Sequence, residues 1–250
     1  MTKLSVNINK IATLRNSRGG NIPNVLKAAV DVQSFGADGV TVHPRPDERH
    51  IRYQDVYDIK PAITTEFNIE GYPSENFMEL VTKVKPHQVT LVPDPPEAIT
   101  SSAGWDTITN FTFLQDVIGR LSEAGIRTSI FIDTNPEFIT NAAKTGTDRV
   151  ELYTEPYASG FARDKQKAIA PFVEAAHLAK KLGISLNAGH DLSLENLGFF
   201  IEQIPFIKEV SIGHALISEA IYIGLEKTIA MYQQILKQIE SSVRNLGNNI

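Results

Sequence analysis

The chain has 250 residues, 42% of them hydrophobic, so it can bury a sizeable core as one large domain or two small ones. Its net charge of −5 argues against a general affinity for nucleic acid or an anionic membrane. It has no cysteine, which excludes disulfides, thiolate catalysis and cysteine-based metal sites. No run of 18 apolar residues and no hydrophobic leader occur, so we expect a soluble, cytoplasmic protein without a membrane partner.

Short runs of strand-forming residues recur along the chain, and segments with helical periodicity lie between them. Eight strands are predicted, over Leu4–Asn9, Gly39–His43, Ile63–Glu70, Gln88–Pro93, Arg127–Asp133, Arg149–Thr154, Ile184–His190 and Glu209–His214. The predicted helices cover Pro23–Phe35, Gln54–Ile59, Ser74–Val84, Phe111–Ala124, Pro136–Lys144, Lys165–Leu182, Ser193–Ile204 and Ser218 to about Val243.

Local signals mark several helix ends. Gly36, Gly125 and Gly183 each follow a predicted helix, where a left-handed residue commonly closes the last turn. Ser74 and Ser193 precede helical patterns and are predicted N-caps.

Eight strands that alternate with helices imply parallel pairing through right-handed crossovers. An open doubly wound sheet and a closed barrel both satisfy this pattern, and the strand count, length and spacing favour the barrel. We therefore predict an α/β fold, a (β/α)₈ TIM barrel with extra helices, as a single domain over residues 1–250 with a frayed end. An extended loop, Pro95–Thr109, is a candidate lid, although a plain surface loop would look the same.

Polar and titratable side chains gather at the predicted strand ends, where barrel enzymes place their chemistry. These residues are Asn7, Asn9, His43, Arg45, Glu70, Glu151, His190, Gly213 and His214. One polar residue at a strand end usually caps a turn, but convergence of so many indicates a site. The remaining histidines, His87 and His177, lie before a strand and within a helix, so we expect structural roles for them.

Imidazoles and a carboxylate supply proton donors and acceptors near neutral pH, while Arg18, Arg45 and the backbone N–H groups near Gly213 suit phosphate oxygens. The residues thus favour acid–base chemistry on a phosphorylated small molecule. A Schiff-base aldolase is disfavoured because Lys10 is the only lysine near a strand end. A metal site built from three of the histidines remains geometrically possible, but we predict no metal.

Several motifs closely resemble the pyridoxine 5′-phosphate synthase family across the chain. They are NINKIATLRNSRGG (7–20), GADGVTVHPRPDERHI (36–51), EFNIE (66–70), LVPD (91–94), LNAGHDL (186–192) and IGHALI (212–217). The resemblance implies condensation of 3-amino-2-oxopropyl phosphate with 1-deoxy-D-xylulose 5-phosphate to pyridoxine 5′-phosphate, phosphate and water, in vitamin B6 biosynthesis. It implies no cofactor, and a homo-oligomer, typically an octamer.

The resemblance also implies residue roles. His43 would be the proton acceptor, Glu70 a second acid–base group and His190 the proton donor. The aminoketone phosphate would be held by Asn7, Arg18, the backbone at Asp191, Gly213 and His214. The deoxyxylulose phosphate would be held by Asn9, Lys10, Arg45, His50 and Thr100, and Glu151 would orient the forming ring.

The chain departs from the family pattern at three places. Asn9-Lys10 stands where better-known members have Asp-His, and Asp191 stands where they have glycine. Prolines also replace more flexible residues in the loop 43–50. We expect these changes to adjust affinity, not reaction type. Two alternatives remain open: another phosphosugar isomerase or epimerase on this fold, and a non-catalytic barrel that binds phosphorylated metabolites.

Overall fold

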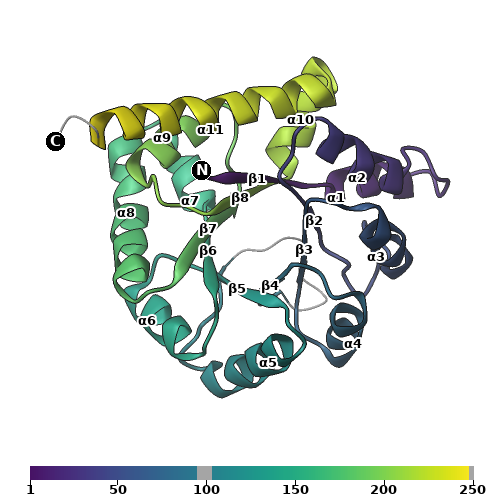
Figure 1. Cartoon of the computed structure of the whole chain (residues 1–250), viewed down its shortest axis with the longest axis horizontal. Helices are drawn as coiled ribbons and strands as arrows, with labels where there is room; N and C mark the ends of the chain where they lie inside the picture. Colours follow the sequence, from purple (N-terminus) through teal and green to yellow (C-terminus); the bar gives the residue numbers. More distant parts are fainter. Residues whose placement is uncertain (95–102, 248–250) are drawn as a thin grey trace.

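A closed barrel of eight parallel strands forms the centre of the molecule (Figure 1). The computed structural model describes residues 1–94 and 103–247, with side chains up to 242. The strands are β1 (Lys3–Asn7), β2 (Gly39–Val42), β3 (Glu66–Gly71), β4 (Gln88–Leu91), β5 (Arg127–Ile132), β6 (Arg149–Tyr153), β7 (Ser185–His190) and β8 (Glu209–Ile212). Pairing of β1 with β8 closes the ring, so the predicted barrel is confirmed and the open sheet is excluded.

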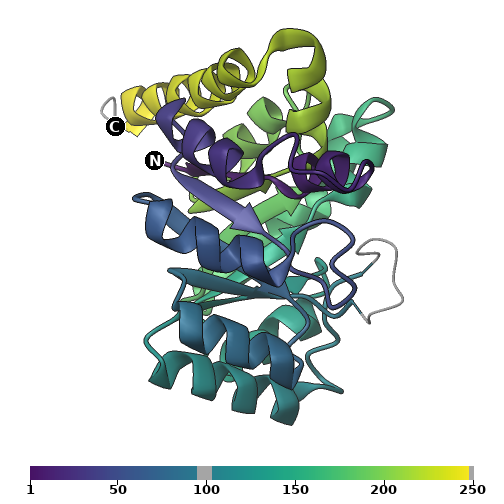
Figure 2. The ribbon, with the colours of Figure 1, turned by 90° about the vertical axis from the view of Figure 1, so that its right-hand side faces the viewer.

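Helices surround the strands, and the last helix runs along the outside of the barrel, where it packs against β1 (Figure 2). They are α1 (Asn9–Asn16), α2 (Val25–Ser34), α3 (Tyr53–Ile59), η1 (Lys60–Ala62), α4 (Glu75–Val84), α5 (Phe111–Glu123), α6 (Pro136–Lys144), α7 (Glu155–Phe161), α8 (Lys165–Lys181), α9 (Leu197–Gln203), α10 (His214–Ile223) and α11 (Leu225–Gly247). In the described ranges, none of them has the length and apolar character needed to span a membrane.

The predicted boundaries hold with a few exceptions. Gly36, Gly125 and Gly183 all have positive φ, and the Ser74 side chain accepts from the Phe77 N–H, as predicted. Ser193 is not an N-cap, because α9 begins four residues later and the Asn196 side chain instead accepts from the Ser193 N–H.

Two α-helices and the short η1 were not predicted, and one predicted helix is divided. The patterns of α1 and α7 were missed, and the expected helix from Ser218 is broken at Gly224, where φ is +91°. The break creates α10 directly after β8. Of the residues 244–250 that were expected to fray, 244–247 belong to α11, and 248–250 lie outside the described part of the chain.

The two faces of the strands differ in chemistry. Outward residues such as Val6, Val40 and Ile69 are fully buried against the helices. The inward side chains form a polar column, which comprises Ser5, Thr41, Asn68, Gln88, Thr90, Arg127, Arg149, Asn187 and Glu209. Bonds that cross the barrel, such as Gln88 to Glu209 at 3.4 Å, show that this column fills the interior. Buried polar groups need such partners, so the column holds the strands in register.

The segment after residue 102 is fixed to the barrel. The Trp105 N–H donates to the Phe131 carbonyl, its indole N–H donates to the Leu91 carbonyl, and its ring is 3% exposed. The Thr107 side chain is fully buried and donates to the Phe138 carbonyl. This part of the candidate lid Pro95–Thr109 is therefore built into the fold, whereas 95–102 lie outside the described residues.

Substitution of Gly104 by alanine is expected to destabilise the protein. The added Cβ would lie 2.4 Å from the backbone of Ile132 and Asp133, which cannot move without disturbing β5. We expect a loss of about 2 kcal/mol in the free energy of unfolding, measured by urea denaturation. The control is G119A, at an exposed helical glycine with nothing within 4 Å of the new Cβ, which should gain up to about 1 kcal/mol. Equal effects from both changes would contradict the packing argument.

Candidate active site

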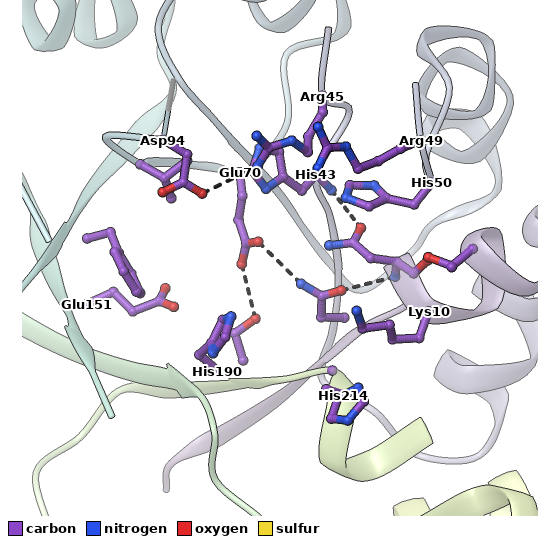
Figure 3. Close-up of a pocket in the computed structure, with 17 residues that line it drawn as sticks. Lys10, His43, Arg45, Arg49, His50, Glu70, Asp94, Glu151, His190 and His214 are labelled. Carbon is purple, nitrogen blue, oxygen red and sulfur yellow. Dashed lines mark hydrogen bonds and ion pairs between the residues drawn. The ribbon is translucent and has the colours of Figure 1, made fainter. Parts of the chain in front are cut away.

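A cavity of about 360 Å³ opens at the C-terminal ends of the strands (Figure 3). His43, Glu70, His190 and His214, which lie far apart in the sequence, all line it. They follow or end β2, β3, β7 and β8, because the carboxyl ends of parallel strands meet at one mouth. The other polar lining residues include Asn7, Asn9, Lys10, Arg45, Arg49, His50, Asp94, Glu151 and Ser211.

Two carboxyl groups lie deep in the cavity. Burial and the nearby charge of Asp94 raise the pKa of Glu70 to about 7, against the opposing effect of His190. The Asn7 amide donates to Oε2 of Glu70 at 3.2 Å, and the Ser211 hydroxyl lies 3.5 Å from Oε1. Burial and the charge of Glu70 raise the pKa of Glu151 well above its usual value, and no described residue bonds its buried Oε2. Glu70 can thus exchange a proton near neutral pH.

The two histidines on either side of Glu70 have opposite proton preferences. Burial and the positive charges of its neighbours, first His50 and then Arg45, lower the pKa of His43 well below its usual value. Burial disfavours the charged form of His190 too, but the hydrogen bond and charge of Asp191 outweigh it and raise the pKa of this ring. His43 is therefore suited to accept a proton and His190 to donate one.

Lys10, Arg45, Arg49 and the ring of His50 line one side of the mouth, and we call this group the cationic rim after its lysine and two arginines. Arg45 is 4% exposed and its Nη1 lies 3.5 Å from Asp94 Oδ2, while Arg49 pairs with Asp47 at 2.5 Å. Burial and the charge of Arg45 lower the pKa of His50 to about 4, so its ring is neutral near pH 7. Such a rim is suited to an anion.

Arg49 and Asp94 line the cavity but were not among the predicted site residues. Sequence signals for both exist: Arg49 lies in the same loop as Arg45, and Asp94 follows β4 as the last residue of LVPD.

The start of α10 forms another part of the wall. Gly213 is its N-cap and His214 its first residue, so the free N–H groups of a ten-residue helix begin at the mouth. A Cβ on Gly213 would lie 3.0 Å from the Cβ of Asn7, which explains the glycine here. This end of the helix is a second place where an anion could bind.

The remaining predicted site residues lie in different environments. The Asn9 side chain accepts from the His43 N–H at 2.9 Å and so holds the start of that loop. Arg18 is exposed and does not line the cavity, and Thr100 lies outside the described residues. The Asp191 N–H donates to the Gly189 carbonyl and the Thr154 hydroxyl, so it is already occupied inside the protein.

The other two histidines have structural surroundings, as expected. His87 Nδ1 accepts from the Phe67 N–H at 3.0 Å, and the His177 ring packs 5.5 Å from the Phe206 ring. No set of three metal-ligating side chains comes together in residues 1–94 and 103–247, so the three-histidine metal site has no geometric support.

The loop that carries the cationic rim is held by a buried arginine. Arg15 is 2% exposed; its guanidinium pairs with Asp55 at 2.5 Å and donates to the His50 carbonyl at 3.0 Å. The Asn16 amide donates to the same carbonyl at 2.8 Å. A charge so deeply buried needs its partner, so the pair links α1, the loop 45–52 and α3 into one support.

The fold and the site together define a (β/α)₈-barrel enzyme whose mouth joins acid–base side chains to a cationic rim. Residues 4–238 match the family model described as "Pyridoxal phosphate biosynthesis protein PdxJ". The chain therefore belongs to this family, in agreement with the resemblance noted in its motifs.

Curated relatives agree with this membership. The pyridoxine 5′-phosphate synthase of Bacteroides fragilis (strain YCH46) is 66% identical over 237 residues, covering 95% of this chain and all of the relative. That of Porphyromonas gingivalis is 58% identical, covering 94% and 99%.

Solved structures of other enzymes share the fold at low identity. Phosphoribosyl anthranilate isomerase from Thermotoga maritima aligns with a TM-score of 0.60 at 14% identity, covering 95% of this chain and 100% of that one. Tryptophan synthase from M. tuberculosis aligns with a TM-score of 0.63 at 12% identity, covering 95% and 92%. These likenesses support the barrel architecture alone.

Substitution of Asp55 by asparagine should destabilise the fold, because it leaves the buried charge of Arg15 without its counter-ion. We expect a loss of about 3 kcal/mol in the free energy of unfolding, measured by urea denaturation. E75Q is the matched control, because the Glu75–Arg120 pair is exposed and should contribute much less. If D55N lowered the free energy of unfolding no more than E75Q does, the Arg15–Asp55 pair would not be needed for stability.

Proposed function

We propose that the chain condenses 3-amino-2-oxopropyl phosphate with 1-deoxy-D-xylulose 5-phosphate, releasing pyridoxine 5′-phosphate, inorganic phosphate and water. The observation that carries this proposal is the placement of His43, Glu70 and His190 around one cavity with opposed proton preferences. Ring closure with dehydration requires repeated proton transfer, which such a set can supply. Membership of the family and the names of its curated relatives support the same reaction.

The protonation state that each of the three groups favours gives it a different role. His43, whose lowered pKa favours its neutral form, accepts a proton; His190, whose raised pKa favours its protonated form, donates one to a departing oxygen. Glu70, with a pKa of about 7, can act in either direction between them. The buried Glu151 lies beside this path and would orient the forming ring.

The two substrate phosphates would occupy opposite sides of the mouth. The cationic rim of Lys10, Arg45, Arg49 and His50 suits the deoxyxylulose phosphate. The N-terminus of α10, with Gly213, His214 and the nearby Asn7, suits the aminoketone phosphate, since barrels commonly bind phosphate after the last strands. Arg18 and Thr100 remain predicted contacts of the aminoketone and deoxyxylulose phosphates, respectively.

The amine for the new ring comes from the aminoketone, so the protein needs no lysine nucleophile. Lys10 is the only lysine among the described residues that line the cavity, and it lies in the rim beside His50. Its ammonium group would therefore neutralise phosphate charge and not form an imine.

The chain would form one domain and act in the cytoplasm. It would assemble into a homo-oligomer, which in the family that its motifs resemble is typically an octamer. Exposed apolar side chains on α10, Ile221 and Tyr222, support self-association because monomers seldom expose them together.

Release of inorganic phosphate is expected only when both substrates are supplied, and this assay tests the proposed reaction. An isomerase or epimerase would convert one substrate alone, and a non-catalytic barrel would convert neither. Malachite green detects released phosphate, absorbance identifies the pyridine product, and proton NMR of each substrate incubated alone detects isomerisation, so the three cases are distinguished. Conversion of one substrate alone, or no reaction when both substrates are present, would overturn the proposal.

Substitution of His190 and of Arg45 should affect different kinetic constants. H190A is expected to lower kcat by about 10² to 10⁴-fold while leaving substrate binding largely intact, because it removes a proton donor. R45A should mainly raise KM for the deoxyxylulose substrate, by about tenfold to a hundredfold, because a charge-assisted bond to phosphate is lost. R163A, at an exposed arginine on the surface, is the control. Near-normal turnover by H190A would refute the donor assignment.

A further inference from the structure

The turn that ends β7 has an unusual backbone. His190 has φ +80°, a conformation that side-chain-bearing residues seldom adopt. The Asp191 N–H donates to the Gly189 carbonyl at 3.2 Å, which closes a three-residue turn around His190. The buried Thr154 hydroxyl donates to the same carbonyl and accepts from the same N–H. Such strained residues persist where the surroundings enforce them, and they are frequent at functional sites.

Asp191 is held from both ends of its backbone. Besides the N–H contacts, its carbonyl accepts from the amide of Asn196, which is 5% exposed. Its side chain does not line the cavity but points to the neighbouring ring, with Oδ2 2.6 Å from His190 Nδ1. His190 itself lines the cavity. The carboxylate therefore lies behind the imidazole, away from any bound phosphate.

We propose that Asp191 is a positioning residue, whose carboxylate accepts from the Nδ1–H of His190 and so fixes the orientation of that ring. A carboxylate on Nδ1 leaves Nε2 as the nitrogen that can reach a ligand. A glycine at this position would have no side chain that could do this. The Asp191 side chain thus acts on the donor rather than on a phosphate contact. This inference depends on the proposed function only for the role of His190 as a proton donor.

Other charges also face the ring. Glu70 on β3 and Asp94 after β4 both raise the pKa of His190, whereas burial lowers it, and Tyr153 on β6 packs edge-on at 5.9 Å. Removal of the Asp191 charge alone therefore leaves the raising effects of Glu70 and Asp94 in place against the lowering effect of burial. A donor works in its protonated form, so activity falls as pH rises through this pKa, and a lower pKa moves the fall to lower pH.

The test is a titration of the six histidine rings by NMR in the wild type, D191N and E195Q, with His190 assigned from H190Q. D191N keeps the shape of the side chain but removes its charge, and should lower the His190 midpoint by about one pH unit. E195Q, an exposed carboxylate four residues along the same loop, should leave it unchanged. In D191N, the alkaline limb of the plot of kcat against pH should move to lower pH together with the His190 midpoint.

An unchanged His190 midpoint in D191N, or the same shift in E195Q, would overturn the proposal. This outcome can be told apart from a failure of the proposed function. Normal turnover by H190Q would show that His190 has no catalytic role. The NMR titration of His190 in D191N would still show whether Asp191 acts on that ring. A midpoint temperature of thermal unfolding for D191N close to that of the wild type would show that the turn itself is intact.

Discussion

The polar column inside the barrel is the constraint on which the rest of the structure depends. A barrel of eight strands has room for side chains only, and here the inward positions carry hydroxyl, amide and charged groups that bond to one another across the interior. Arg127 and Arg149 pair with Glu66 and Glu209 at the base. Because each group needs its neighbours, the column sets the relative heights of the strands and therefore of the residues at their ends.

The column also accounts for the electrostatics of the mouth. Its arginines lie at the base, while Glu70 and Glu151 lie near the top, out of water. Burial therefore keeps both pKa values high. On the rim side, by contrast, His43 and His50 lie close to Arg45, which disfavours their charged forms. One cavity thus holds acids and bases whose proton affinities differ because their positions differ.

Much of this arrangement could be predicted from the sequence, for identifiable reasons. Most strands alternate a buried outward residue with a polar inward one, and several carry a titratable side chain at or just after their end, as at His43 and Glu70. Helix α1 was missed because its apolar residues are few, and α7 because it contains both Pro156 and Gly160. The break at Gly224 looks in sequence like one glycine within a continuous helical pattern.

Other features of the site depend on three-dimensional placement. Nothing in the local pattern distinguishes Arg49, which lines the cavity, from Arg18, which does not. The direction of the Asp191 side chain follows from the turn at His190 and its bonds to Thr154, and these involve residues on another strand. The support of the rim by Arg15 likewise joins three elements that are separate in the chain.

The aromatic cluster beside β4 has a practical consequence. Trp105 is the only tryptophan of the chain, and its ring stacks on Tyr72 at 5.8 Å. Tyr72 in turn borders a small hollow that is shared with His43 and Arg45. The protein therefore carries a single tryptophan fluorophore, one aromatic ring away from the rim, whose emission offers an optical signal for ligand entry without any attached label.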